Sequence, residues 1–316
     1  MPGMDEYDVV IVGGGAAGLS AALVLARARR RVLVVDAGDP RNARAAHMHG
    51  FLSRDGLPPG ELLAVGREEV AGYGGTVVAD AVSEVERVSD AFRLRLAGGA
   101  EVSARRLVVA TGLRDVLPEV EGLRERWARD VLHCPYCHGW EVRDRRLGVL
   151  ASASPASVDY AQIVRQWSDD VVLLVPPDAL TDTQRTDLTA RRIEVVEGVI
   201  DAVEVTDDAL TGVELADGRR VRLDALFVPP RFVPHHALLE TLGCDLDDDG
   251  WVVRDGTGRT SVPGVWVAGN VANPRAQVVT AAGEGSAAAI AVNADLVADD
   301  VRTAVRTAVR TSLPAG

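Results

Sequence analysis

The chain opens with short apolar runs separated by a glycine-rich turn. Residues 8–12 and 32–36 are almost wholly apolar, and residues 19–29 between them are rich in alanine and leucine. Apolar runs of this length without polar alternation are typical of strands buried on both faces, as in parallel sheets. The pattern predicts a strand, a tight turn at residues 13–18, a helix and a second parallel strand.

Polar–apolar alternation replaces this pattern further along. It runs from residue 76 to residue 109 and predicts a β-meander, because alternate side chains of a half-buried strand face opposite sides. The apolar end of this stretch, residues 106–110, predicts a buried strand that stops at Thr111 and Gly112.

The strand–helix–strand pattern then recurs. Residues 147–151 and 171–175 read as strands, residues 157–167 between them fit a helix, and alternation follows over residues 193–228. A second unit of the same kind, again with its own meander, is therefore expected.

The last part of the chain returns to the first unit. Residues 265–268 read as a strand and residues 281–296 as a small-residue helix. We expect an α/β fold of two Rossmann-like domains, each of three-layer ββα type, with the second inserted in the first. The expected bounds are 1–113 and 234–316 for the discontinuous domain and 114–233 for the inserted one.

The net charge of the chain limits the classes of molecule that we expect it to bind. The net charge is −12, and all 34 basic residues are arginine. Without a basic stripe to neutralise phosphates, neither a nucleic acid nor an anionic membrane is an expected partner. The N-terminus has acidic residues where a signal peptide would be basic, and glycines interrupt the uncharged stretch 9–26, so we expect a cytoplasmic protein without a membrane span.

The first turn carries a dinucleotide-binding pattern. Gly13, Gly15 and Gly18 form Gly-x-Gly-x-x-Gly between strand and helix, and Asp36 ends the next strand. Gly13 permits the sharp turn, Gly15 lets backbone approach a pyrophosphate, and Gly18 lets the helix pack on the strand. The helix N-terminus offers N–H groups to phosphate, and Asp36 can accept hydrogen bonds from a ribose.

Two further segments carry a family resemblance. Ala110-Thr111-Gly112 at a strand end and residues 264–270 near the C-terminus resemble motifs of the pyridine nucleotide-disulfide oxidoreductase family. The resemblance covers nearly the whole chain and implies FAD as cofactor, with Asn270 in place of the family's aspartate at the ribityl chain. The residues we expect around FAD, besides those of the first turn, are Ala16, Ala17, Arg41, His49, Val82, Ala110, Thr111, Gly112, Gly269, Asn270, Gln277 and Val278.

A cysteine pair lies in the inserted domain. Cys134 and Cys137 in Cys-Pro-Tyr-Cys-His could attach a c-type haem, form half of a zinc site, be structural thiols or form a redox disulfide. A c-type haem would require an export signal, which we do not expect here, and a zinc site would require a second pair of ligands. We therefore favour the redox disulfide. An Asp-rich stretch at residues 245–250 imitates a calcium loop but has Gly256 where the loop needs a glutamate, so no metal site is expected.

The residue after the pair refines the resemblance. In low-molecular-weight thioredoxin reductases the pair stands at this place and an acidic residue follows it, whereas here His138 follows. Cys-Pro-Tyr-Cys-His-Gly resembles the flavin-dependent dithiol oxidases that close the disulfides of gliotoxin and holomycin. The resemblance implies that Cys137 faces the flavin and Cys134 meets the thiol substrate. A histidine can take the proton of an incoming thiol, with Glu141 as a candidate to orient it.

The second unit lacks the expected nicotinamide signature. Ala151 and Ala153 stand where the reductases have the first two glycines, and Pro176 and Pro177 stand where arginines bind the 2′-phosphate. We therefore expect the NADPH site to be lost. The favoured function is oxidation of a small-molecule dithiol to a cyclic disulfide, with O2 as acceptor.

Two alternatives stay open at this stage: a thioredoxin reductase fed by ferredoxin or another donor, and a non-enzymatic flavoprotein that sequesters a dithiol. A homodimer is expected from the resemblance alone.

Overall fold

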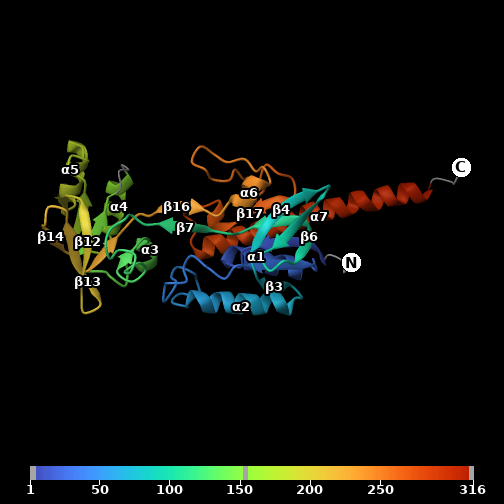
Figure 1. The fold of residues 1–316 in the computed structure, drawn as a ribbon, viewed down its shortest axis with the longest axis horizontal. Coiled ribbons are helices and arrows are strands. Elements are labelled where there is room, and N and C mark those ends of the chain that lie inside the picture. The colour runs from blue at the N-terminus through green and yellow to red at the C-terminus, as the bar shows by residue number, and fades with distance from the viewer. Residues whose placement is uncertain (1–4, 152–155, 313–316) are drawn as a thin grey trace. The chain divides into compact units, whose positions relative to one another are not determined.

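The computed structural model describes residues 5–151 and 156–312, which form two compact units (Figure 1). Unit 1 contains Met1–Ala43, Pro58–Arg114 and Val233–Gly316, and unit 2 contains Arg44–Leu57 and Asp115–Phe232. The sequence places Arg44–Leu57 in the first domain, but its contacts group it with unit 2. The chain passes from one unit to the other four times. Two of these passages run through β7 (Leu113–Val116) and β16 (Arg231–Pro234), which pair with each other.

Unit 1 is built on a seven-stranded sheet of order β3-β2-β1-β6-β5-β4, with β17 also paired to β6. Its parallel strands are β1 (Asp5–Val12), β2 (Val32–Asp36), β3 (Thr76–Ala79), β6 (Glu101–Val109) and β17 (Val265–Val267). The meander consists of β4 (Val82–Val88) and β5 (Ala91–Leu96), antiparallel to each other and to β6. The prediction of one meander from residue 76 is therefore wrong for β3, which instead extends the parallel sheet beside β2.

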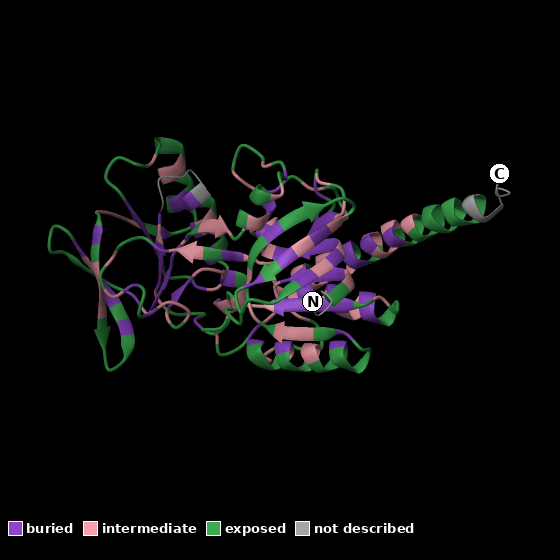
Figure 2. Ribbon diagram, turned by 45° about the vertical axis from the view of Figure 1, so that its right-hand side comes forward, coloured by how far each residue is buried: buried purple, intermediate pink, exposed green. Residues whose placement is uncertain are grey.

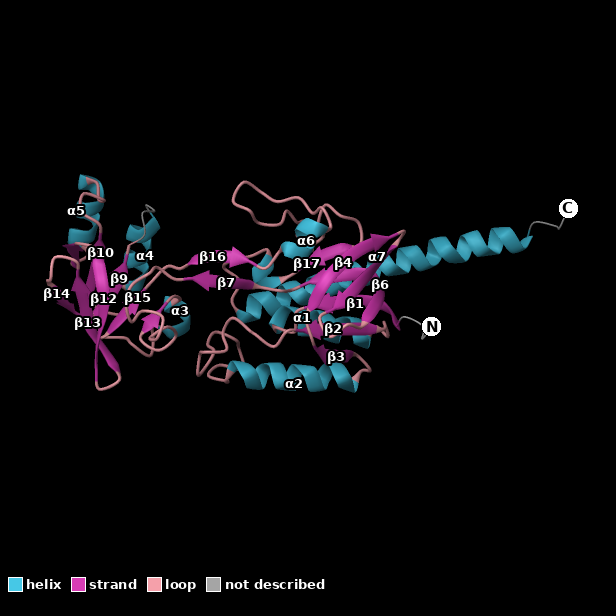
Figure 3. Cartoon of the chain, in the orientation of Figure 1, coloured by secondary structure: helices cyan, strands magenta, loops and turns pink. Residues whose placement is uncertain are grey.

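The two faces of this sheet bury different partners, which makes three layers (Figure 3). Val9 and Ile11 of β1 pack in one core with the helices, while Val10 and Val12 pack in another with meander residues such as Phe92. The helical elements of unit 1 are α1 (Ala16–Arg27), α2 (Pro59–Gly72), α6 (Ala237–Thr241), the 3-10 turn η1 (Gly269–Val271) and α7 (Val278–Ser312). Burial on both faces explains why these strands read as continuous apolar runs.

Unit 2 repeats this plan with a five-stranded parallel sheet of order β11-β10-β9-β15-β8. Its strands are β8 (Val131–Leu132), β9 (Leu147–Leu150), β10 (Val171–Val175), β11 (Ile193–Glu197) and β15 (Ala225–Phe227). A separate antiparallel meander comprises β12 (Ile200–Thr206), β13 (Ala209–Leu215) and β14 (Arg220–Arg222). The helices are α3 (Pro135–His138), α4 (Ala156–Val164) and α5 (Asp182–Ala190). Leu173 of β10 faces the helices and Leu174 faces the meander, so unit 2 is also three-layered.

Helix α7 is longer than the predicted segment 281–296. Its buried positions end at Leu296, and residues 301–309 are exposed throughout (Figure 2). Over the described residues, no helix has the length and apolar character that a membrane crossing requires.

Candidate flavin and disulfide sites

The glycine turn after β1 has the shape that a dinucleotide pyrophosphate requires. Gly13 has φ +106°, and a Cβ built on it would lie 2.4 Å from the carbonyl oxygen of Ala110. A Cβ on Gly18 would lie 1.8 Å from the carbonyl oxygen of Gly13, so any side chain there would separate α1 from the turn. At Gly15 the built Cβ has no atom of the described residues within 4 Å. The turn therefore combines two close backbone contacts with one open position beside the N-terminus of α1, as phosphate binding needs.

Asp36 lies at the carboxyl end of β2, beside this turn. Its Oδ1 accepts hydrogen bonds from the backbone N–H groups of Gly14 and Gly38, each at 3.2 Å. Its Oδ2 lies 3.8 Å from Nη1 of Arg67, which is too long for a hydrogen bond. One carboxylate oxygen thus fixes the turn, and the other is left for a ribose diol. These residues fit the adenosine half of FAD.

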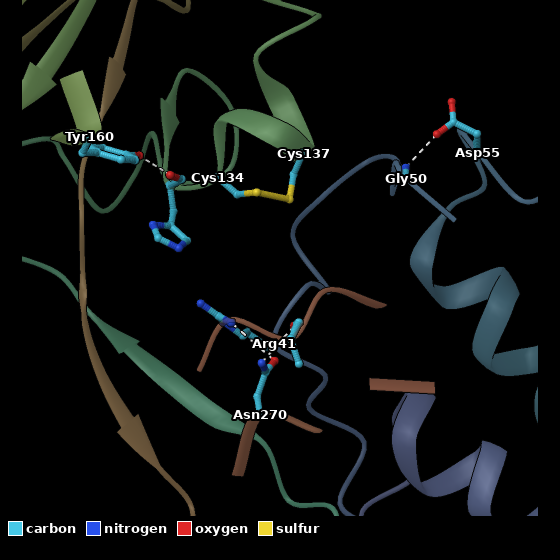
Figure 4. The surroundings of a disulfide bond; sticks show 9 residues. Arg41, Gly50, Asp55, Cys134, Cys137, Tyr160 and Asn270 are labelled. Atoms are coloured by element: carbon cyan, nitrogen blue, oxygen red, sulfur yellow. Dashed lines mark hydrogen bonds between the residues drawn. A yellow bond between two sulfur atoms is a disulfide. The ribbon is translucent and has the colours of Figure 1, made fainter. Parts of the chain in front are cut away.

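A network of hydrogen bonds holds Asn270, at the end of the predicted FAD-binding segment 264–270. Asn270 donates from Nδ2 to the carbonyl oxygens of Asn273 (2.9 Å) and Ala276 (3.0 Å), and its Oδ1 accepts from Nη1 of Arg41 at 3.4 Å. Arg41 and Asn270, both expected at the cofactor, are therefore brought together in unit 1 (Figure 4).

Glu284 of α7, which sequence reasoning missed, fixes the same turn. Its carboxylate accepts from the backbone N–H of Gly269 (2.8 Å) and from Nδ2 of Asn273 (2.7 Å), and it pairs with Arg254 at 3.1 Å. A carboxylate inside a small-residue helix is the signal that could have pointed to it.

The other predicted cofactor residues fall at strand and helix ends of unit 1. Ala110, Thr111 and Gly112 follow β6, and the Thr111 hydroxyl donates to the carbonyl oxygen of His235 at 2.6 Å. The remaining ones occupy the start of α1, the start of β4 and the start of α7: Ala16, Ala17, Val82, Gln277 and Val278. His49 is the exception, because its loop belongs to unit 2.

Cys134 and Cys137 form a disulfide across the four-residue helix α3, with their Cα atoms 5.2 Å apart (Figure 4). Cys134 is the N-cap and Pro135 takes the first helical position, where the missing N–H costs nothing. Gly139 ends the helix against the Trp167 ring, which a Cβ would approach to 2.7 Å. The hydroxyl of Tyr160, on α4, donates to the carbonyl oxygen of His133 just before the pair.

His138 is the last residue of α3 and is half-buried. Burial lowers the pKa of His138 below its usual range; the Glu141 carboxylate raises the pKa, and the charge of His49 lowers it further. The net effect favours the neutral imidazole, which can accept a proton.

Glu141 contacts His49 rather than His138. The Nε2 of His49 lies 3.4 Å from Oε1 of Glu141, and its Nδ1 lies 3.3 Å from Oδ2 of Asp55. No hydrogen bond between Glu141 and His138 occurs among the described residues. The imidazole of His49 thus bridges two carboxylates, one on its own loop and one just after the disulfide helix.

Alanine and proline follow the strands at the carboxyl edge of the unit 2 sheet. Ala151 follows β9, and Ala153 lies outside the described residues. Pro176 and Pro177 follow β10 and are exposed. An open hollow of about 690 Å³ at the ends of β10 and β11 is lined by Pro177, Asp178, Arg185, Val195, Val196, Glu197 and Arg219.

Both arginines of this hollow already bind acidic partners. Arg185 forms an ion pair with Glu197. Arg219 pairs with Asp217 at 2.8 Å and donates to the Glu197 carbonyl oxygen at 2.5 Å. The hollow therefore offers no unpaired cation to a phosphate.

The third cysteine has no part in this chemistry. Cys244 is buried in unit 1 and lies 3.6 Å from the hydroxyl of Thr260. Among the described residues there is no group of His, Cys, Asp and Glu that could hold a metal ion.

Comparison with known proteins places these features in a family. The crystal structure of HlmI has a TM-score of 0.93 and 55% sequence identity, covering 98% of each chain. The thioredoxin reductase tcpT of Claviceps purpurea is 31% identical over 92% of this chain and 95% of its own length. A probable thioredoxin reductase of Arthroderma benhamiae is 38% identical, but the match takes in 46% of this chain and 38% of that protein.

The family model for pyridine nucleotide-disulphide oxidoreductases matches residues 7–285, which is most of the chain. Membership of this family implies FAD binding, and the glycine turn with Asp36 fits that cofactor. The chain therefore belongs to the pyridine nucleotide-disulphide oxidoreductase family, as a flavoprotein with a thioredoxin-reductase-like fold.

Proposed function

We propose that this protein is an FAD-dependent dithiol oxidase that closes an intramolecular disulfide in a small-molecule natural product. The observation that carries the proposal is the disulfide of Cys134 and Cys137 with a half-buried His138 next to it, whose pKa is lowered by burial. A neutral imidazole accepts a proton, as oxidation of a thiol requires, whereas reduction of a disulfide requires a group that gives one. The similarity to HlmI over nearly the whole chain also supports the proposed function.

In the proposed reaction His138 takes the proton of one substrate thiol, and the thiolate attacks Sγ of Cys134. The bond between Cys134 and Cys137 breaks, Cys137 leaves as a thiolate, and a mixed disulfide forms. The second substrate thiol then displaces Cys134, and the departing Cys134 sulfur takes the proton of that thiol. The substrate has lost two electrons and two protons and leaves as a cyclic disulfide, while the pair has gained the two electrons.

FAD, when bound, supplies the oxidant that restores the cysteine disulfide and the route by which two electrons reach O2. Gly13, Gly15, Gly18 and Asp36 would hold its pyrophosphate and ribose, because they provide the open backbone position and the hydrogen-bond acceptor described above. The protein contributes binding, alignment of the cysteines and proton transfer at His138.

We also propose that NADPH is not the electron donor. A phosphate at the carboxyl edge of the unit 2 sheet would meet Asp178 and Glu197, and both arginines there already have acidic partners. The methyl group of Ala151 and the ring of Pro176 stand where a nucleotide needs close backbone approach and a cation. These four features together disfavour an anionic dinucleotide.

Anaerobic titration of the flavin absorbance tests both proposals. We expect no bleaching with NADPH, bleaching with a small dithiol such as dithiothreitol, and recovery with peroxide formation when air is admitted. Prompt bleaching by NADPH would instead identify a reductase. Cys134→Ser and Cys137→Ser should each abolish dithiol turnover with FAD retained, while Cys244→Ala serves as the matched control because its thiol is buried in unit 1 and is not part of the disulfide. Turnover in either serine variant refutes the scheme.

The second candidate is a thioredoxin reductase fed by a donor other than NADPH. Tyr136 and Trp140, each 65% exposed around the disulfide, favour it, because exposed aromatic side chains are common at protein interfaces. Rapid bleaching by reduced thioredoxin, with dithiothreitol much slower at equal thiol concentration, would favour this candidate over the small-molecule oxidase.

A further inference from the structure

The loop Arg44–Leu57 carries an imidazole that reaches the segment after the disulfide helix. His49 and Glu141 are far apart in sequence, yet Nε2 of His49 lies 3.4 Å from Oε1 of Glu141 within unit 2. The other ring nitrogen, Nδ1, lies 3.3 Å from Oδ2 of Asp55. An imidazolium satisfies both carboxylates at once, because both of its ring nitrogens are donors.

A backbone hydrogen bond is the main cause of a lowered pKa at Asp55. Its Oδ1 accepts from the backbone N–H of Gly50 at 2.8 Å, and this hydrogen bond, followed by the one from His49, lowers the pKa of the Asp55 carboxyl. The loop thus presents a fixed anion to one side of His49, while Glu141 faces the other side. A chain of carboxylate, imidazole and carboxylate runs from the loop to the cysteine segment.

His138 lies within the electrostatic reach of two members of this chain, Glu141 and His49, and is hydrogen-bonded to neither among the described residues. The two act on it with opposite signs. Burial has the largest influence on the pKa of His138, and the charges of Glu141 and His49 modify this pKa without a direct hydrogen bond to the imidazole.

We propose that His49 is a positioning residue of the thiol chemistry: it binds Glu141, three residues after His138, and so fixes the carboxylate whose charge acts on His138. This role rests on the proposed function, because it matters only if His138 accepts the thiol proton. In this proposal Glu141 acts on His138 through its charge and does not orient the imidazole directly. The loop Arg44–Leu57 then contributes to the reaction between the substrate thiol and the disulfide.

The opposite signs make a sharp test. His49 lowers the pKa of His138 and Glu141 raises it, so His49→Gln should move the acid limb of the pH–rate profile to higher pH. Removing the charge of Glu141 does the reverse, so Glu141→Gln should move the same limb to lower pH. The double variant should return towards the wild type. His47→Gln is the matched control, because His47 lies on the same loop and its Nδ1 lies 2.9 Å from the carbonyl oxygen of Gly56 instead of bridging to Glu141.

The assay is anaerobic stopped-flow reduction of the FAD-loaded enzyme by dithiothreitol between about pH 5 and 9, which brackets the unperturbed histidine pKa of about 6.5. At the pH where the wild-type rate is half-maximal, we expect His49→Gln to be about two- to fivefold slower, the effect of one partly exposed neighbouring charge. Glu141→Gln should be faster there, by at most about twofold, since the rate is already half of its plateau.

His138→Gln separates this proposal from the proposed function. If that variant keeps the wild-type acid limb, His138 is not the proton acceptor and the proposed chemistry fails. If it loses the limb while His49→Gln and Glu141→Gln leave it in place, or move it in the same direction, the role of His49 is refuted and the proposed function stands. FAD content, measured by absorbance after gel filtration, reports whether His49→Gln acts through the cofactor instead. A loss of FAD with an unmoved limb also overturns the proposal.

Discussion

Two glycines near the start of α7 give a matched pair of variants with opposite expected effects. A Cβ on Gly285 would lie 2.0 Å from the carbonyl oxygen of Ala17 and 2.8 Å from its carbonyl carbon, whereas a Cβ on Gly283 has no atom of the described residues within 4 Å. Both substitutions to alanine gain about 0.8–1 kcal/mol of helix propensity. Only Gly285→Ala meets backbone atoms of α1, so the difference between the two variants isolates the cost of that overlap.

The overlap is large for a packed helix pair. An ordinary carbon–oxygen contact is about 3.3 Å, so α1 and α7 would have to separate by roughly 1 Å, in a core where overpacking costs about 1–3 kcal/mol or more. In a protein of this size 1 kcal/mol corresponds to about 2–4 °C in Tm, so Gly285→Ala should melt roughly 2–12 °C below Gly283→Ala. Because Ala17 belongs to the glycine turn, Gly285→Ala should also retain less FAD.

Circular dichroism melts of both variants, with FAD content measured in parallel, provide the check. Gly283→Ala should melt slightly above the wild type and keep its FAD. If Gly285→Ala melts at or above Gly283→Ala, the close approach of the two helices is not a constraint and the reasoning from Gly285 to the flavin turn is refuted.

Two further substitutions test other parts of the structure. Arg126 is nearly buried and binds Asp130 through Nε at 2.8 Å and through Nη2. Arg126→Met leaves the largely buried Asp130 carboxylate with the backbone N–H of Leu210 as its hydrogen-bond donor, so the free energy of unfolding should fall by about 3–5 kcal/mol. A denaturant titration that shows a loss below about 1 kcal/mol, the value of an exposed ion pair, would contradict this. Asp36→Ala removes the acceptor of the Gly14 and Gly38 N–H groups as well as the predicted ribose contact, so FAD affinity should fall about tenfold or more, the value of one charged hydrogen bond; equal affinity by fluorescence titration would remove Asp36 from the site.

The strands that could be predicted from the sequence are those buried on both faces, because they appear as uninterrupted apolar runs. The predicted segments 32–36 and 171–175 match β2 and β10 to the residue, because both strands are covered on two faces and so contain almost no polar side chain. Strand β3 was assigned to the wrong partner, since half-buried alternation shows that a segment is a strand but not which neighbour it pairs with. Helix α5 was missed altogether, although Thr181 and Gln184 form a capping box that marks its start.

The functional residues that could be predicted are likewise those that belong to short local motifs. The glycine turn and the cysteine pair are each contained in six residues or fewer, so the sequence pattern alone predicts their geometry. Glu141 shows why the rest was out of reach. It stands three residues after His138, a spacing that would bring the two together on a helix. Helix α3 ends at His138, however, and residues 139–144 form turns. The Glu141 carboxylate contacts His49 instead. A pairing between distant segments leaves no local pattern, and the proton chemistry of this site depends on such a pairing.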